Sequence, residues 1–266
     1  MMFTFGRQPV SLFVEPCAGA LGVALALAGS RAPCGWMGGK SGYADAILQT
    51  MGLRRGQGLE ELWIADTNDW AKAWPVLLGG HARECAEIIR GWCGTPAEEA
   101  RRWRELRDVW RAEGTPETPE GAARWVALVR MSFAAKGPSA GCGLNEDGSP
   151  VGNISRWSAC FRRDIASLPT IRTRAWPDAR EVPTPPPGAH VLIDPPYDGT
   201  TGYGGGLPRA DVLALGSRLA SDGAKVWICA HDPLGPGAVD ISALRWGTVR
   251  GKSVRTSEWL TPWGAA

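Results

Sequence analysis

The sequence lacks the features that mark several large classes of protein. Its longest apolar stretch, residues 18–28, is too short and too rich in glycine and alanine to span a bilayer, and the N-terminus has no signal-peptide pattern. The formal net charge is only +2, so any attraction to nucleic acid must come from a local patch. The seven cysteines include no C-x-x-C pair, which predicts reduced core thiols in a cytoplasmic protein.

Length and composition instead indicate a globular chain with a packed core. At 266 residues and 44% hydrophobic composition, the chain has room for one large α/β domain or for a domain with a substantial insertion. Tryptophan is abundant and tyrosine is scarce, with 14 of the former and 3 of the latter. We expect most of the tryptophans to lie in the core or between helices.

A glycine-bearing turn at residues 15–22 follows a predicted strand at 11–14 and precedes a predicted helix at 23–28. Its spacing is G-x-x-G, not the G-x-G-x-x-G of dinucleotide-dependent oxidoreductases, so that class of protein loses its main support. Small residues let backbone approach a ligand, and a helix N-terminus offers free N–H groups. An ordinary tight turn between a strand and a helix has the same composition, so both interpretations stay open.

The stretch Gly39-Lys40-Ser41 is an incomplete phosphate-binding loop. A P-loop requires a glycine five residues before Gly39, where this chain has Cys34. Two interpretations stay open for this stretch. Either Lys40 presents its ammonium group to a carboxylate, or the segment is a flexible surface loop.

The apolar run 190–193 is followed by four residues that could take part in binding or catalysis. They are Asp194, Pro195, Pro196 and Tyr197. The run is typical of a strand that is buried in a parallel sheet, and two prolines cannot continue a central strand. The sequence therefore predicts an acid and an aromatic side chain at the carboxyl edge of a sheet. Open α/β sheets bind their ligands at that edge.

A second acidic residue, Asp66, ends another predicted strand at residues 62–65. In a βαβ unit an acid at this position is the usual partner of ribose hydroxyl groups, because a carboxylate accepts from both hydroxyls at once. The alternative is that Asp66 caps the helix that begins near Trp70. We favour the ribose role.

The strand pattern disappears between residues 84 and 180, and helices are predicted at 97–111, 121–135 and 154–168. Trp103, Leu106 and Trp110 fall on one stripe of the first of these helices. Residues 101–180 hold 14 Lys and Arg against 9 Asp and Glu, so the charge of the chain is segregated. Such a segment suits contacts with phosphates, although part of it also suits solvated helix faces. The candidate nucleic-acid contacts are Arg130, Lys136, Asn145, Arg156 and, outside this segment, Tyr203.

The C-terminal part returns to the sheet after a stiff proline-rich linker at residues 181–188. A helix is predicted at 207–219 and a strand at 225–230. Two closing strands at 244–249 and 257–263 form a predicted antiparallel pair. The glycine-rich stretch 198–206 has the composition of a mobile lid.

The landmarks together resemble the S-adenosylmethionine-dependent DNA adenine-N6 methyltransferases, whose catalytic motif is D-P-P-Y. Residues 14–25 are similar to the cofactor turn of that family, residues 36–40 to its W-x-G-G-K block, and residues 65–68 to its acid-ended second strand. In the family the W-x-G-G-K block precedes the cofactor turn, whereas in this chain it follows the turn.

The resemblance implies an α/β fold with a Rossmann-like methyltransferase sheet, mostly parallel with an antiparallel C-terminal strand pair. Residues 1–83 and 181–266 would form the catalytic core. Residues 84–180 would form a mainly helical, basic target-recognition insertion. The implied cofactor is S-adenosylmethionine and the implied partner is DNA, with no metal and no membrane, in the cytoplasm of a bacterial or phage-type host cell.

The resemblance also assigns roles to individual residues. Residues implied to bind the cofactor are Glu15, Pro16, Gly19, Trp36, Lys40, Asp66 and Asp194. The catalytic residues would be Asp194, Pro195, Pro196 and Tyr197. By analogy with the family, Asp194 and the Pro195 carbonyl accept the two hydrogens of the amine, and Tyr197 stacks on a base that has flipped out of the duplex, with residues 200–206 closing over it.

Four alternatives to adenine-N6 methylation of DNA remain. Methylation of cytosine N4 in DNA and of adenine N6 in RNA use the same geometry. The third alternative is a catalytically inactive nucleic-acid-binding protein of the same fold, and the most distant is a dinucleotide-dependent oxidoreductase.

Overall fold

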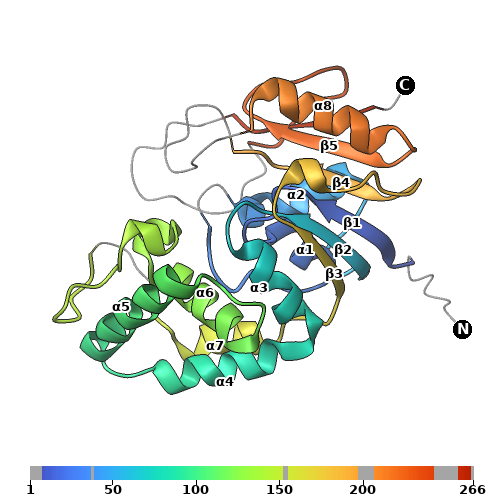
Figure 1. Cartoon of the computed structure of the whole chain (residues 1–266). Coiled ribbons are helices and arrows are strands. Elements are labelled where there is room, and N and C mark those ends of the chain that lie inside the picture. The colour runs from blue at the N-terminus through green and yellow to red at the C-terminus, as the bar shows by residue number, and fades with distance from the viewer. Residues whose placement is uncertain (1–7, 37–38, 152–154, 197–206, 243–256, 265–266) are drawn as a thin grey trace, which may run out of the picture.

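The computed structural model describes residues 8–36, 39–151, 155–196, 207–242 and 257–264. These residues form one mixed sheet of seven strands in the order β3-β2-β1-β4-β5-β7-β6, with helices on both faces (Figure 1). The strands are β1 (Val10–Glu15), β2 (Leu59–Ala65), β3 (Arg172–Trp176), β4 (His190–Ile193), β5 (Lys225–Ala230), β6 (Val239–Asp240) and β7 (Trp259–Trp263).

The first five strands are parallel, and β7 runs antiparallel to both β5 and β6. The predicted Rossmann-like α/β fold with a reversed C-terminal strand is therefore confirmed. The order of the parallel strands reverses between β1 and β4, because β1 leads to β2 on one side and β4 leads to β5 on the other. This reversal is the place at which doubly wound sheets bind ligands.

The central strands are apolar because both faces of the sheet are covered. One face packs against α1 (Gly22–Leu27), α2 (Ala44–Thr50) and α3 (Trp70–Val76), and the opposite face packs against α8 (Arg209–Ala220). Strand residues alternate between these two layers: Phe13 faces the first cluster and Val14 the second. Burial on both sides explains why strands β1 and β4 contain so few polar residues.

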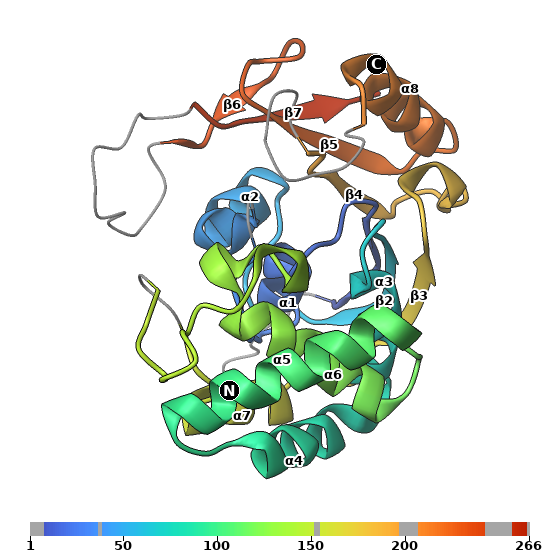
Figure 2. The same ribbon diagram turned by 60° about the vertical axis from the view of Figure 1, so that its left-hand side comes forward.

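The helical segment consists of α4 (Ala82–Trp92), α5 (Pro96–Glu113), α6 (Pro119–Met131) and α7 (Ala159–Ala166). In both views these four helices lie together at the end of the molecule opposite α8 and β5 (Figures 1 and 2). Their core is continuous with the core under the sheet, since Trp125 of α6 lies 5.8 Å, centroid to centroid, from Trp70 of α3. The apolar stripe on α5 is confirmed, with Trp103 fully buried.

Single turns of 3-10 or π helix connect the larger elements. They are η1 (Lys40–Tyr43), η2 (Leu77–His81), η3 (Phe133–Ala135), η4 (Pro138–Ala140) and η5 (Ala179–Glu181). None of the described helices combines the length and the apolar character needed to span a bilayer.

The structure corrects the expectation that residues 84–180 hold no strand. Strand β3 lies in this range and pairs in parallel with β2. Its sequence, RTRAW, carries two arginines on one face, and both form ion pairs with Glu61 of β2, at 2.6 Å from Arg172 and 3.0 Å from Arg174. An edge strand that is half-buried and held by ion pairs to its neighbour needs no run of apolar residues. The apolar pattern by which the other strands were predicted is therefore missing from β3.

Several predicted boundaries also move. Helix α4 was not predicted, and the helix predicted at 154–168 is the shorter α7, which begins where the Ser158 hydroxyl accepts the Phe161 N–H at 3.2 Å. Strand β7 is antiparallel as expected, but its described partners are β5 and β6. The strand predicted at 244–249 and the lid predicted at 198–206 both lie outside the described residues.

Candidate active site

A pocket opens at the carboxyl ends of β1, β2 and β4, where the strand order reverses. The cavity has a volume of about 180 Å³, measured as the space open to the centre of a water molecule. This is more than ten times the volume that one buried water requires on the same measure. The pocket therefore has room for an organic ligand. Nine residues that the sequence analysis singled out line it: Glu15, Pro16, Gly19, Trp36, Lys40, Asp66, Asp194, Pro195 and Pro196.

Glu15 ends β1 with a buried carboxyl group. Its Oε1 accepts the backbone N–H of Ala24 at 2.9 Å, which ties the end of the strand to the first turn of α1. Burial raises the pKa of Glu15 to about 8; the hydrogen bond from Ala24 acts in the opposite direction and the charge of Asp194 adds to the rise. Near neutral pH this carboxyl group therefore holds a proton in the protein without ligand.

The turn between β1 and α1 has a strained backbone. Gly19 and the fully buried Leu21 both adopt left-handed conformations, with φ of 46° and 52°. A bulky residue in this region costs on the order of 1–3 kcal/mol, so the surrounding packing must hold Leu21 in place. Such strain is often found where backbone approaches a ligand.

Asp66 fastens this turn to the end of β2. Its Oδ2 accepts the N–H of Gly19 at 2.8 Å, and its Oδ1 accepts the N–H of Asn68 at 2.7 Å. The N-cap of α3 is Asp69, so the alternative that Asp66 caps the helix near Trp70 is wrong. Burial raises the pKa of the Asp66 carboxyl, while the hydrogen bonds from Asn68 and Gly19 lower it. The ribose-binding role stays a prediction.

Two tryptophans hold the other side of the turn. The indole N–H of Trp74 donates to the carbonyl of Gly19 at 2.8 Å. A Cβ atom on Gly19 would lie 3.0 Å from Cδ1 of Trp36, so the turn and the Trp36 ring are in close contact. Trp36 in turn meets Trp70 edge to face at 5.8 Å. The turn is thus fixed between α3 and the segment that carries Trp36.

Lys40 lines the pocket although its segment follows the turn between β1 and α1 in the sequence. Its Nζ lies 2.7 Å from Oδ1 of Asp194, and the side chain is only 6% exposed. The segment is seated closely on the turn, since a Cβ on Gly22 would lie 2.6 Å from the backbone nitrogen of Ser41. Of the two interpretations of Gly39-Lys40-Ser41, the one in which Lys40 presents its ammonium to a carboxylate is confirmed.

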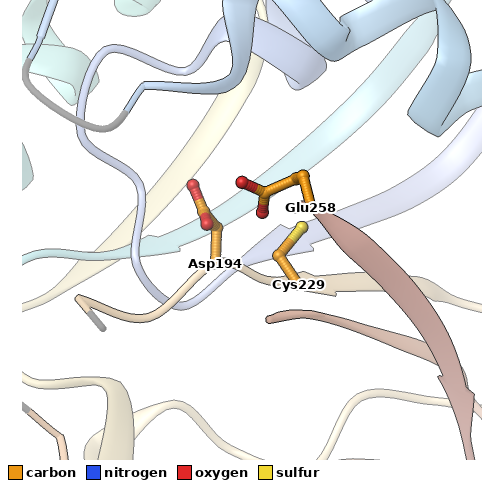
Figure 3. Close-up of side chains that lie close together, drawn as sticks. All are labelled: Asp194, Cys229 and Glu258. Atoms are coloured by element: carbon orange, nitrogen blue, oxygen red, sulfur yellow. The ribbon is translucent and has the colours of Figure 1, made fainter. Parts of the chain in front are cut away.

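Asp194 lies in a cluster with two residues that the sequence analysis did not identify, Cys229 at the end of β5 and Glu258 just before β7 (Figure 3). The carboxylate oxygens and the thiol sulfur lie within 4.8 Å of one another. Lys40 Nζ is also 3.5 Å from Oε1 of Glu258. Burial lowers the pKa of Lys40, but the neighbouring carboxylate of Asp194, with that of Glu258, outweighs this effect, so its pKa is raised and the side chain is an ammonium. Burial raises the pKa of the Cys229 thiol, which therefore stays neutral.

The residues that follow β3 form a further part of the pocket lining. Asp178, Ala179 and Arg180 line the pocket, and Arg180 pairs with Asp178 at 2.6 Å. This bidentate hydrogen bonding, acting against partial burial, lowers the pKa of Asp178 to about 2. No sequence pattern indicates these residues, because the strand that precedes them, β3, contains no apolar run.

The four predicted nucleic-acid contacts that the structure describes, Arg130, Lys136, Asn145 and Arg156, are not among the residues that line the pocket. Two of them, Arg130 and Arg156, are engaged in contacts within the protein. Arg156 donates from Nε to Glu99 at 2.7 Å and from Nη2 to the carbonyl of Gly94 at 2.8 Å. Arg130 is half-buried, with its guanidinium 5.0 Å from the centre of the Phe161 ring. These arginines make contacts inside the protein. The prediction that they contact nucleic acid was based only on their charge and did not take such contacts into account.

Lys136 and Asn145 are exposed, and the Asn145 amide donates to the Ser149 hydroxyl at 2.9 Å within its own loop. Tyr197 and Tyr203 lie outside the described residues.

Fold and pocket together define a Rossmann-like α/β protein with a pocket at the carboxyl edge of its sheet. A scan against protein-family models finds no family that matches this chain, and a search of curated proteins finds no significant match.

Proposed function

We propose that the chain is an S-adenosylmethionine-dependent methyltransferase that modifies the N6 amine of adenine in DNA. The observation that carries this proposal is the convergence of Asp194, Lys40 and the Gly19 turn on one pocket. These residues come from three of the separate sequence motifs that resemble the methyltransferase family. Their meeting at the strand-order reversal supports a common role in binding one cofactor and one acceptor.

The chemistry of the pocket suits a cationic cofactor. Apart from the protonated Glu15, its carboxyl groups belong to Asp66, Asp178 and Asp194, whereas its cations are Lys40 and Arg180. S-adenosylmethionine supplies a methyl group on a positively charged sulfonium. Asp66 is the residue that would accept from the ribose hydroxyls, since a carboxylate has about four acceptor sites and protein atoms occupy only some of them.

The acceptor amine is a weak nucleophile, because its lone pair is delocalised into the purine ring. Asp194 accepts one amine hydrogen and the Pro195 carbonyl accepts the other, which favours a pyramidal nitrogen with its lone pair directed at the methyl group. Pro195 is buried, and the two prolines fix the orientation of that carbonyl. As the new nitrogen–carbon bond forms, the carbon–sulfur bond would break with its electron pair left on a neutral thioether, and one amine hydrogen would leave as a proton through its hydrogen bond to Asp194. Transfer then depends mainly on positioning.

DNA is the proposed macromolecular partner, and the base leaves the duplex to reach the pocket. The excess of positive charge between residues 101 and 180 supports contact with phosphates. Because Arg130 and Arg156 are engaged internally, the more exposed Lys136 and Asn145 are the better candidates among the described residues. As a DNA-modifying enzyme the protein would act in the cytoplasm of a bacterial or phage-type host, without a metal.

The first test is transfer of a labelled methyl group to adenine-containing duplex DNA by the wild type and by Asp194→Asn. The substitution keeps the size of the side chain and an oxygen for Lys40, but it removes the charge. We expect transfer to fall by at least two orders of magnitude, with DNA binding unchanged in a mobility-shift assay. Activity near that of the wild type would overturn the role of Asp194.

A further inference from the structure

A second pocket opens beside α1 and α2, outside the site described above. The two helices lie side by side, and residues that follow each of them form much of the pocket wall (Figure 2). The lining includes residues 29–32, which follow α1, and Arg55, which follows α2. Gly22 lines both this pocket and the first one, so the two pockets adjoin at the start of α1.

The second pocket is large because small residues form part of its wall. Its volume, measured as the space open to the centre of a water molecule, is about 530 Å³, compared with about 180 Å³ for the first pocket. Gly22, Gly29 and Ala32 contribute little or no side chain to it. One buried water requires only about 10–15 Å³ on the same measure, so this space admits a ligand as large as a sugar with its phosphates.

Two arginines supply the positive charge of this pocket. Arg55 donates from Nε to Oδ1 of Asp45 at 2.8 Å and from Nη1 to the carbonyl of Ser30 at 3.4 Å, and these contacts hold its guanidinium at the pocket wall. Arg31 is exposed, and none of the described carboxylates lies within ion-pair distance of it. Of the described residues that line the pocket, only Asp45 is acidic, so positive charge is in excess.

This set of side chains suits a phosphate group. A guanidinium binds phosphate oxygens well, because its planar array of N–H donors matches two oxygens at once. Ser30 and Ser41 add hydroxyl groups that can donate to the same ligand. Because the two pockets adjoin at Gly22, a nucleic-acid strand that places a base in the first pocket brings its neighbouring phosphates close to the second.

We infer that Arg31 and Arg55 bind phosphates of the DNA strand that flank the target nucleotide. The part of the chain that forms the sheet then contributes to DNA binding itself, in addition to the basic helical segment. The contact is with the backbone, so it positions the strand and does not read its sequence. This inference rests on the proposed function, because that function supplies DNA as the partner.

The test measures the salt dependence of duplex DNA binding by fluorescence anisotropy in the wild type, in Arg31→Ala and in Arg55→Ala. A phosphate contact releases counterions, so its loss reduces the slope of log Kd against log salt concentration by about 1. We expect this reduction for each variant, with binding weakened about five- to tenfold at about 0.1 M salt, equally for duplexes of different sequence. Slopes that stay at the wild-type value in both variants would overturn the inference.

Arg54→Ala is the matched control, because Arg54 is exposed and adjacent to Arg55 but does not line the pocket. We expect its slope to equal that of the wild type. A reduction as large as that of Arg55→Ala would show an effect of overall surface charge and would contradict a contact in this pocket.

Two further measurements separate a phosphate contact from a role in folding. Arg31→Lys keeps the positive charge, so we expect it to recover most of the wild-type slope, and a slope as low as that of Arg31→Ala contradicts the inference. The affinity of Arg31→Ala for S-adenosylmethionine should match that of the wild type, since Arg31 does not line the first pocket. A parallel loss of cofactor affinity would show a disturbed turn at Gly22 and would overturn the inference.

Failure of the proposed function gives a different result. A wild-type protein that binds no DNA overturns that function and this inference together. A wild type that binds and methylates DNA, with a slope insensitive to Arg31 and Arg55, overturns the inference alone. Calorimetric binding of inorganic pyrophosphate that depends on Arg31, without any change in the DNA slope, would assign the pocket to a free anion and would also contradict the inference.

Discussion

Glu15 should make the stability of the protein depend on pH in a direction opposite to that of most carboxylates. Burial raises the pKa of Glu15 from its ordinary value of 4.5 to about 8 in the folded protein. In the unfolded chain the side chain is solvated and loses its proton near pH 4.5. Between these two values the folded state holds a proton that the unfolded state has released.

The free energy of unfolding must therefore fall as pH rises through this window. Below pH 4.5 both states are protonated and the contribution of Glu15 is fully present. Each pKa unit is worth about 1.4 kcal/mol, so the shift corresponds to at most about 5 kcal/mol lost by pH 8. Glu15→Gln removes the ionisation and keeps an oxygen that can accept the Ala24 N–H.

Urea denaturation of the wild type and Glu15→Gln at pH 5 and pH 8 measures this effect. We expect the variant to gain a few kcal/mol relative to the wild type on going from pH 5 to pH 8. Glu60→Gln is the matched control, since Glu60 is exposed on the adjacent strand β2, and its difference from the wild type should not change with pH. A Glu15→Gln difference that stays constant between the two pH values would refute the assignment of a buried, protonated carboxyl group.

Two further predictions concern the cofactor turn and the class of ligand. Gly22→Ala should lower the free energy of unfolding by about 1–3 kcal/mol, because the new Cβ would lie 2.6 Å from the backbone nitrogen of Ser41 and 2.7 Å from its Cα. The control is Gly91→Ala, since Gly91 lies in a helix with open space around it. In the same urea experiment this control should be neutral or slightly stabilising. In a thermal-shift assay S-adenosylmethionine should raise the melting temperature and NAD should not, and the opposite result would favour an oxidoreductase.

Three of the site residues that sequence reasoning found, Glu15, Asp66 and Asp194, lie at or just beyond the ends of apolar strands. The pattern of β1, β2 and β4 is strong because these strands are buried on both faces, and parallel strands bring their carboxyl ends to one edge. Glu15, Asp66 and Asp194 could therefore be predicted to meet.

The residues that were missed depend on long-range pairing. Glu258 reaches Asp194 only through the antiparallel pairing of β5 with β7. Asp178 follows a strand whose charged sequence hides its secondary structure. Arg156 was judged by its charge, yet its partner Glu99 lies 57 residues away in the sequence. Local pattern carries no information about such contacts.

The central claim is tested most directly by identifying the nucleoside that receives the methyl group. Duplex DNA is incubated with the wild-type protein and labelled S-adenosylmethionine, digested to nucleosides and separated, with Asp194→Asn as the inactive reference. We expect label in N6-methyladenine with the wild type and none above background with the variant. Label in N4-methylcytosine, label only when RNA replaces DNA, or no label in any nucleoside would contradict it.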